Sequence, residues 1–191
     1  MFEVSDKTQR KRRLFVVDDF YSNPDEIRNY ALTQVEYQED IRWYKGLRST
    51  QAFRTEEMKR AFEFIIGERI VDWESSYNGV FQLMRSQDPQ VYHFDTQRWA
   101  AMIYLSPNAP IESGTRLHRS RRNLTRHRDQ PNANEAFGGE FLDSTLFDVA
   151  DSAANIYNRL VIMDAGCFHS AGPYFGNTME TGRLTHLFFF D

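Results

Sequence analysis

Two residues of the kinds that bind metal ions lie close together at positions 93 and 95, and a third lies far downstream. If residues 91–95 form an extended strand, the side chains of His93 and Asp95 project from the same face, because successive side chains alternate. With His169 they make two imidazoles and one carboxylate, the set that holds a non-haem Fe(II) ion and leaves other positions open. The sequence therefore predicts a metal centre at these three residues.

Each of these three side chains also has an ordinary structural interpretation. His93 and Asp95 could form a surface pair near a strand end, and His169, which follows an apolar run at 160–163, could be a hydrogen-bonded core histidine. Metal ligation is the better hypothesis for His169. The distal ligand must come from another strand to close a face around the ion, and His169 follows a separate predicted strand. Other divalent metals bind such sites more tightly than Fe(II), so the identity of the ion depends on availability.

A second polar pair, Arg183 and Thr185, lies on a run whose alternate members are apolar: Leu184, Phe188 and Phe190. A period of two places the guanidinium and the hydroxyl on one face of the strand and His186 on the other. An arginine that points into a protein is costly unless an anion meets it, and its planar guanidinium matches a carboxylate with two parallel hydrogen bonds. The pattern predicts an anion site at Arg183, with a salt bridge to an Asp or Glu as the alternative.

In this order the motifs resemble the signature of the Fe(II)/2-oxoglutarate-dependent dioxygenases, in particular their prolyl-4-hydroxylase-like branch. The likeness extends from about residue 78 to residue 191 and rests on His93-Phe94-Asp95, His169 and Gly182-Arg183-Leu184-Thr185. The resemblance implies that His93, Asp95 and His169 hold Fe(II). It also implies that Arg183 holds the far carboxylate of the co-substrate 2-oxoglutarate, with further contacts from Thr185, Tyr104 and Gln82. For Tyr104, a place in the core is the competing interpretation.

The resemblance implies an enzyme, a hydroxylase that oxidises a C–H bond of a small-molecule or peptidyl substrate and releases succinate and CO2. The carboxylate of Asp95 favours hydroxylation, because related halogenases leave this ligand position to a halide. The pair Gly114-Thr115 is similar to a glycine-rich feature of prolyl hydroxylases, but the arginine-rich residues 116–128 depart from those enzymes. This departure puts peptidyl proline in question as the substrate.

Three other functions are compatible with the sequence. The chain could be a jelly-roll binding module without catalysis, or a cupin-like metalloenzyme that does not use 2-oxoglutarate and in which Arg183 makes an unrelated salt bridge. The third is a basic interaction protein that acts through residues 116–128, which carry six arginines together with His118 and His127. We expect this segment to be an exposed loop that acts as a lid over the open end of the barrel.

Two helices and a series of short strands have to position these residues. Residues 23–26 predict the start of a first helix, with Asn23 as its N-cap. A second helix is predicted from Thr55 to about Ile66, with Gly67 to stop it. Strands are predicted for residues 14–20, 70–74, 79–85, 91–95, 99–106, 159–164 and 183–190.

These elements favour a mainly β fold with flanking helices. Residues 37–54 have no clear period and predict a long loop between the two helices. The resemblance narrows the fold to a double-stranded β-helix, a jelly-roll core of the cupin type, with the N-terminal helices packed on one sheet.

Composition limits the remaining possibilities. A chain of 191 residues, of which 41% are hydrophobic, predicts a single domain over residues 1–191, with 1–13 as a polar lead-in. The net charge of −4 argues against nucleic acid or an anionic membrane as a partner of the whole protein. Cys167 is the only cysteine, and no apolar run is long enough for a signal peptide or a membrane span, which together predict a reducing, cytoplasmic location.

Overall fold

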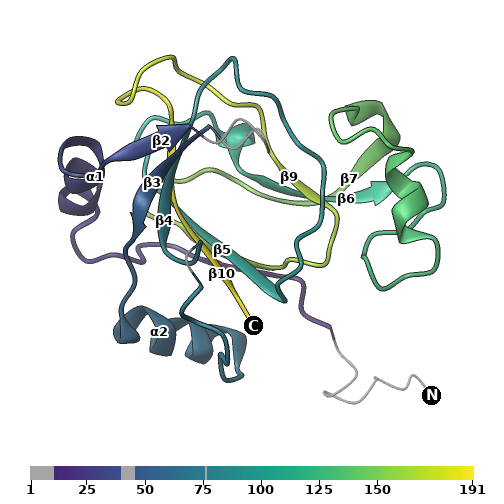
Figure 1. The fold of residues 1–191 in the computed structure, drawn as a ribbon, viewed down its shortest axis with the longest axis horizontal. Helices are drawn as coiled ribbons and strands as arrows, with labels where there is room; N and C mark the ends of the chain where they lie inside the picture. The colour runs from purple at the N-terminus through teal and green to yellow at the C-terminus, as the bar shows by residue number, and fades with distance from the viewer. Residues whose placement is uncertain (1–10, 40–45, 76) are drawn as a thin grey trace.

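The computed structural model describes residues 11–39, 46–75 and 77–191 of the chain. These residues form two α-helices, α1 (Pro24–Thr33) and α2 (Glu56–Ile66), together with short β-strands (Figure 1). The strands are β1 (Leu14–Val17), β2 (Tyr37–Glu39), β3 (Leu47–Ala52), β4 (Val80–Met84), β5 (Trp99–Tyr104), β6 (Thr115–Ser120), β7 (Phe147–Ala153), β8 (Leu160–Asp164), β9 (His169–Ala171) and β10 (Arg183–Phe190). Short 3-10 turns lie at Ile111–Ser113, Ala133–Phe137 and Ser144–Leu146. Within the described residues, no helix is both long and apolar enough to cross a membrane.

The strands form two antiparallel sheets that pack against each other (Figure 1). The major sheet has seven strands in the order β1-β8-β5-β10-β4-β3-β2, and the minor sheet has three in the order β7-β6-β9. Neighbouring strands are often distant in the chain, and β10, the last strand, lies between β5 and β4. This topology places Arg183 and Thr185 beside strands from the middle of the chain.

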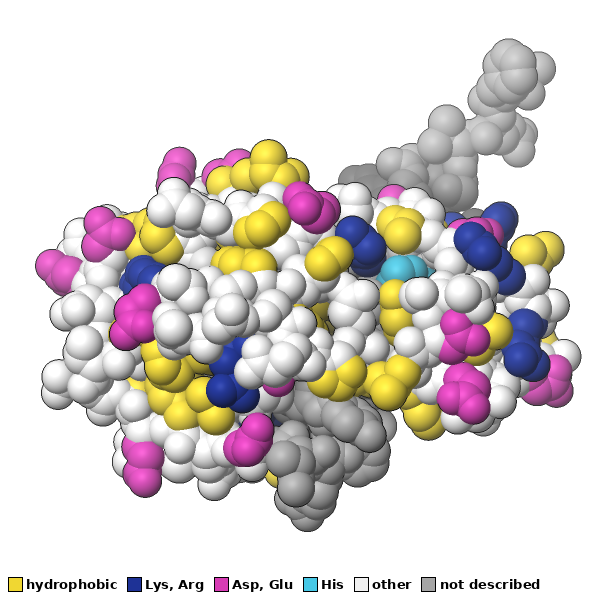
Figure 2. Space-filling view, turned by 90° about the horizontal axis from the view of Figure 1, so that it is seen from above, with side chains coloured by type: hydrophobic (Ala, Val, Ile, Leu, Met, Phe, Trp, Pro, Cys, Tyr) yellow, Lys and Arg dark blue, Asp and Glu magenta, His cyan; other side chains and the backbone are white. Residues whose placement is uncertain are grey.

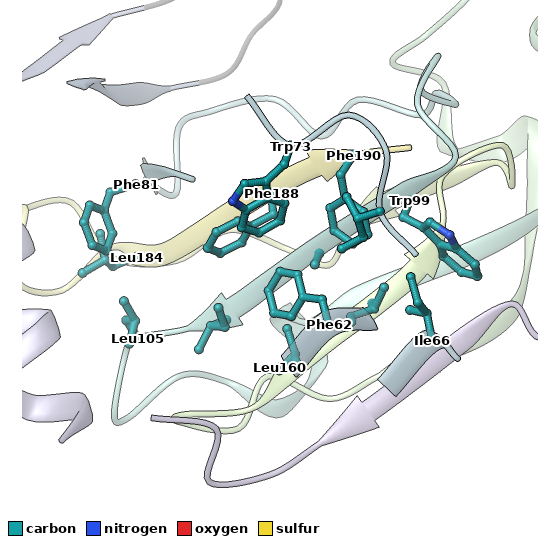
Figure 3. Packing of buried hydrophobic residues seen from close by; sticks show 14 of the residues in the cluster. Phe62, Ile66, Trp73, Phe81, Trp99, Leu105, Leu160, Leu184, Phe188 and Phe190 are labelled. Carbon is teal, nitrogen blue, oxygen red and sulfur yellow. The ribbon is translucent and has the colours of Figure 1, made fainter. Parts of the chain in front are cut away.

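The two helices cover the outer face of the major sheet, as predicted from the sequence. Alternate residues of β10 point to this side, among them Phe188, whose ring centroid lies 5.0 Å from that of the fully buried Phe62 of α2 (Figure 3). Trp73 stacks on Phe188 in the same cluster. On the inner face, Met102 of the major sheet packs with Leu117 of the minor sheet. The period of two thus separates a core under the helices from a core between the sheets.

The second helix begins and ends where the sequence predicts. Thr55 accepts a hydrogen bond from the Met58 amide at 3.2 Å, and Gly67 closes the helix with φ 77°, the left-handed conformation that favours glycine. In the first helix, Asn23 takes the N-cap position, but its side chain caps no helix amide and instead donates to Glu26 at 3.4 Å. The predicted position of this cap is confirmed.

Several strand predictions need correction. Residues 70–74 form no strand, because Trp73 packs into the core under the helices instead of entering a ladder. Residues 91–95 pair only through a single bridge at His93. Conversely, residues 37–54, predicted as a loop, contain β2 and β3, which extend the major sheet at its edge. Residues 40–45 and the first ten residues of the predicted lead-in lie outside the described residues.

His186 lies in the core under the helices, on the face of β10 opposite Arg183, as predicted. Its ring packs between Phe81 and Phe188, with centroids 4.2 and 4.5 Å away. Nε2 donates to the Gly79 carbonyl at 3.1 Å, and Nδ1 accepts from the Tyr21 hydroxyl at 2.7 Å. Both nitrogens are satisfied in the neutral ring, and burial lowers the pKa of His186 to about 4.

We expect His186 to make the stability of the fold depend on pH. An unfolded histidine takes up a proton near pH 6.5, whereas the folded one resists protonation down to about pH 4, so the unfolded state binds more protons between these values. The free energy of unfolding should therefore fall as the pH is lowered from 6.5 to 4. Urea unfolding at pH 7, 6 and 5 measures this slope.

The matched variant is His186→Gln. It removes one of two buried histidines with a lowered pKa, the other being His118, whose pKa burial lowers to about 4. The slope should become shallower without disappearing. An unchanged slope in the variant would show that His186 is not the group responsible.

Candidate metal centre

The structure brings His93, Asp95 and His169 together at the edge of the minor sheet. His169 begins β9, which pairs with β6, and His93 forms a bridge with His169 in which each amide donates to the other's carbonyl, at 3.1 and 2.8 Å. The Asp95 amide donates to the Ala165 carbonyl at 2.9 Å. The chain segment before β5 is therefore tied to the turn before β9, and one ligand atom from each of the three side chains lies within 4.8 Å of the others.

The distances between these ligand atoms suit a single ion. His93 Nε2 lies 3.6 Å from Asp95 Oδ1, and His169 Nε2 lies 3.3 Å from Asp95 Oδ2. For metal–ligand bonds of about 2.1 Å, two ligand atoms are separated by about 3.0 Å at a right angle and about 3.4 Å at a tetrahedral angle. The observed separations are within a few tenths of an ångström of these values.

The hydrogen bonds of the two imidazoles fix which nitrogen faces the carboxylate. Nδ1 of His93 donates to the Val91 carbonyl at 3.2 Å, and Nδ1 of His169 donates to the Cys167 carbonyl at 2.9 Å, since a carbonyl can only accept. In the neutral rings, both Nε2 atoms then carry lone pairs that point toward Asp95. Such an arrangement is stable when a cation lies between the groups, and an orienting bond at Nδ1 is typical of metal-binding histidines.

In the metal-free protein, a proton can take the place of that cation at His169. Burial alone would lower the pKa of His169, but the hydrogen bond and charge of Asp95 outweigh it and raise the pKa overall. Metal binding must displace this proton. The donor set, two imidazoles and one carboxylate, is therefore suited to a divalent metal ion.

The centre is open toward His93. His169 is buried and Asp95 is mostly covered, whereas 39% of the His93 side chain is exposed. Figure 2 shows a face of the molecule on which histidine surface lies beside basic and apolar side chains. Of the five histidines, His93 alone is not buried, so the centre is accessible from its side.

The residues predicted to hold a co-substrate form a row on the inner face of the major sheet. Thr185 of β10 is directly opposite Gln82 of β4 on one side and Tyr104 of β5 on the other. Side chains directly opposite in antiparallel strands share a face, so the three lie side by side. The hydroxyl of Tyr104 forms a hydrogen bond of 2.7 Å with the hydroxyl of Thr115 in β6, and this bond connects the row to the minor sheet.

Arg183 adjoins this row, because it lies two residues before Thr185 in β10 and on the same face of the strand. Its Nε donates to the Ser113 carbonyl at 2.9 Å, and its guanidinium lies 5.3 Å from the ring centroid of Tyr104 and 5.9 Å from that of Tyr174. Only 3% of Arg183 is exposed. Among the described residues, no Asp or Glu forms a salt bridge with Arg183, so the alternative of an ordinary salt bridge finds no support there.

Two neighbours of this row, one basic and one aromatic, were not predicted from the sequence. Arg48 of β3 is buried and lies opposite Gln82, and its guanidinium is 5.9 Å from the ring centroid of Phe189. Tyr174 lies in the connection between β9 and β10 against Arg183. Arg48 belongs to a short polar strand in which apolar residues do not alternate. The sequence therefore gave no sign that this arginine is buried, apart from its apolar and small neighbours.

A second group of ligand-type side chains, His127, Asp164 and Cys167, also lies within 4.8 Å. Asp164 already accepts hydrogen bonds from Arg13, from His127 at 3.0 Å and from the Gly166 amide at 3.2 Å. Burial raises the pKa of the Cys167 thiol to about 11, so the sulfur stays protonated at neutral pH, whereas the thiolate is the metal ligand. We therefore interpret this group as a hydrogen-bond network with a structural role.

The first part of the arginine-rich segment is not the exposed loop that the sequence predicted. Its first residues form β6 at the centre of the minor sheet, where His118 is buried. Arg119 and Arg121 pair with Asp148, at 2.8 and 2.7 Å. The charges that indicated a solvated loop join β6 to β7, so the prediction of an exposed loop is wrong for residues 116–120.

Comparison with solved structures relates this fold to known oxygenases. The chain resembles HygX from Streptomyces hygroscopicus, with nickel, 2-oxoglutarate and hygromycin B bound, at a TM-score of 0.62 and 10% identity over 91% of this chain and 81% of HygX. It also resembles a Trichoplax adhaerens prolyl hydroxylase in complex with a hypoxia inducible factor peptide (TM-score 0.52, 13% identity, 93% and 83% covered). A third resemblance is to a Pseudomonas putida prolyl-4-hydroxylase (TM-score 0.50, 15% identity, 93% and 91% covered).

At these identities the likeness establishes the fold, and the predicted jelly roll with flanking helices, of the prolyl-4-hydroxylase type, is confirmed. A search of curated proteins gave no match. The sequence matches one protein family over residues 2–190, nearly its whole length. The chain belongs to this family, which is described as a family of unknown function, DUF6445.

Proposed function

We propose that this protein is an Fe(II)- and 2-oxoglutarate-dependent oxygenase that hydroxylates a C–H bond of a small-molecule or peptidyl substrate. The observation that carries the proposal is the convergence of His93, Asp95 and His169, whose ligand atoms lie within 4.8 Å of one another inside a fold that oxygenases use. In this proposal the three side chains hold Fe(II). The HygX structure, which holds nickel and 2-oxoglutarate, supports the same class of ligands here.

The proposed co-substrate site is the row next to Arg183. A buried guanidinium needs an anion, and the far carboxylate of 2-oxoglutarate would meet it with two parallel hydrogen bonds. Burial raises the pKa of Tyr104, so its hydroxyl remains protonated at neutral pH. That proton is donated to Thr115 in this structure, and it would turn to the same carboxylate when the co-substrate binds. Thr185 supplies a second hydroxyl, and Gln82 lies beside it.

When bound, Fe(II), 2-oxoglutarate and O2 supply the oxidising chemistry: 2-oxoglutarate is split into succinate and CO2, and one oxygen atom enters the substrate C–H bond. The protein positions the reacting groups and excludes water from them. Arg183 and the tyrosines beside it hold the co-substrate at one end, and apolar residues between the sheets, such as Met102 and Leu187, exclude water. The partly exposed His93 side leaves room for a substrate to approach.

Succinate formation tests the proposal. The purified protein, supplied with Fe(II), ascorbate and 2-oxoglutarate in air, should release succinate. The His169→Ala variant should release none above the rate of the metal and ascorbate alone. Equal release by both proteins, or none by either, would favour a jelly-roll binding module.

A further inference from the structure

The dipeptide His127-Arg128 touches both segments that carry the proposed metal ligands. Nη1 of Arg128 donates to the backbone carbonyl of Asp95 and to that of Gln97, the latter at 3.1 Å. The guanidinium therefore holds the chain immediately after the carboxylate ligand. A charged donor makes such hydrogen bonds stronger than those between neutral groups.

The same dipeptide holds the turn that leads to His169. The Arg128 amide donates to the Gly166 carbonyl at 2.8 Å, and His127 forms an antiparallel bridge with Cys167. Nδ1 of His127 accepts from the Asp129 amide at 3.2 Å, which leaves the proton on Nε2, and Nε2 donates to Asp164 at 3.0 Å. The turn from 164 to 168 is thus fixed from outside the site.

The contact at Gly166 is too close for any other residue. A Cβ atom at this position would collide with the His127 ring, so the turn can approach the dipeptide only because residue 166 is glycine. The side chain of Arg128 is only 27% exposed, against 39% for that of His93.

We propose that Arg128, supported by His127, is a positioning residue that sets the distance between Asp95 and His169 and thereby the affinity and coordination geometry of the metal centre. The inference rests on the proposed function of that centre. Its physical basis is that Asp95 lies outside any strand, so its main chain is not held by a continuous ladder. The guanidinium supplies the constraint that a strand would have supplied.

The test is a titration of the metal-free protein with Co(II), followed by visible absorption, in the wild type and three variants. Arg128→Ala should bind Co(II) 10- to 100-fold more weakly than the wild type and with an altered spectrum, about the effect of losing an outer partner of a metal ligand. Arg128→Lys should recover part of the affinity, because an ammonium can still donate to a carbonyl. Arg126→Ala is the control, since Arg126 is exposed and its backbone bond to Phe168 survives the change.

A purely structural role predicts a different pattern: a lower urea midpoint in the metal-free Arg128→Ala protein with an unchanged Co(II) spectrum and affinity, which would overturn the inference. If Arg128→Ala does not fold, Arg128→Gln decides the question by the same criterion. If the wild type binds no Co(II), or His169→Ala binds it equally well, the proposed centre itself is wrong and the inference falls with it. Those two outcomes do not depend on Arg128, so the failures can be told apart.

Discussion

Replacing Asp95 by alanine is expected to weaken divalent metal binding by more than about 100-fold and to abolish succinate formation from 2-oxoglutarate. Loss of an outer partner of a metal ligand typically costs 10- to 100-fold, and loss of a ligand should cost more. Asp95 is the group to which both Nε2 atoms point, at 3.6 and 3.3 Å, so its removal leaves two imidazoles without the anionic ligand. Co(II) titration measures the affinity, and succinate release measures the activity.

The control for this change is Asp72→Ala, which removes an exposed carboxylate and keeps the main-chain bond of Asp72 to Asp191. It should leave both metal affinity and succinate release within about twofold of the wild type, since exposed charges contribute little. Both variants should keep the wild-type circular dichroism spectrum. Wild-type affinity in Asp95→Ala would mean that the metal, if any, is held elsewhere, and the group at His127 and Asp164 would be the next candidate.

The parts of the fold that the sequence predicted well are those in which burial leaves a regular pattern. β10 has apolar side chains under the helices and polar ones facing the minor sheet, and its bounds are those predicted. In α2 the cap at Thr55, the apolar stripe and the stop at Gly67 all agree. Here local propensity and tertiary burial favour the same structure, so either signal alone is enough.

β3, β6 and β7 lacked such a pattern. β6 carries Arg116 and Arg119, and β7 carries Asp148 and Asp151, so both look like solvated loops in sequence. They form strands because they pair with each other, and the pairing of Arg119 with Asp148 is a contact between residues far apart in the chain. A single sequence contains no local sign of that pairing.

The candidate site shows the same division. Residue types and order were enough to name His93, Asp95 and His169, but the reason given for their common orientation, a strand at 91–95, is wrong. The segment is held by the bridge to His169 and by Arg128, which the sequence had assigned to an exposed loop. The convergence of the three side chains was thus easier to predict than the contacts that position them.

The position of Arg183 allows the proposed co-substrate to be tested separately from the metal. Arg183→Ala should weaken 2-oxoglutarate binding to the Co(II)-loaded protein by about 100-fold or more, because a buried charge pair loses one partner, which typically costs about 2–5 kcal/mol. Co(II) affinity should stay close to that of the wild type, since Arg183 contacts Ser113, Tyr104 and Tyr174 and none of the three proposed ligands. Calorimetric titration of both ligands measures the two affinities.

Arg183→Lys tests whether the planar guanidinium or only its charge is required. Lysine keeps the charge but cannot offer two parallel donors, so 2-oxoglutarate affinity should lie between those of the wild type and Arg183→Ala. Arg69→Ala, a change at an exposed arginine, should have no effect on either ligand. If Arg183→Ala binds 2-oxoglutarate and turns over as the wild type does, the proposed anchor is wrong. The metal centre and the anion site are formed by different residues, so binding of the two ligands can be lost separately. If the wild type binds metal but not 2-oxoglutarate, the result favours a cupin-like metalloenzyme that uses no keto acid.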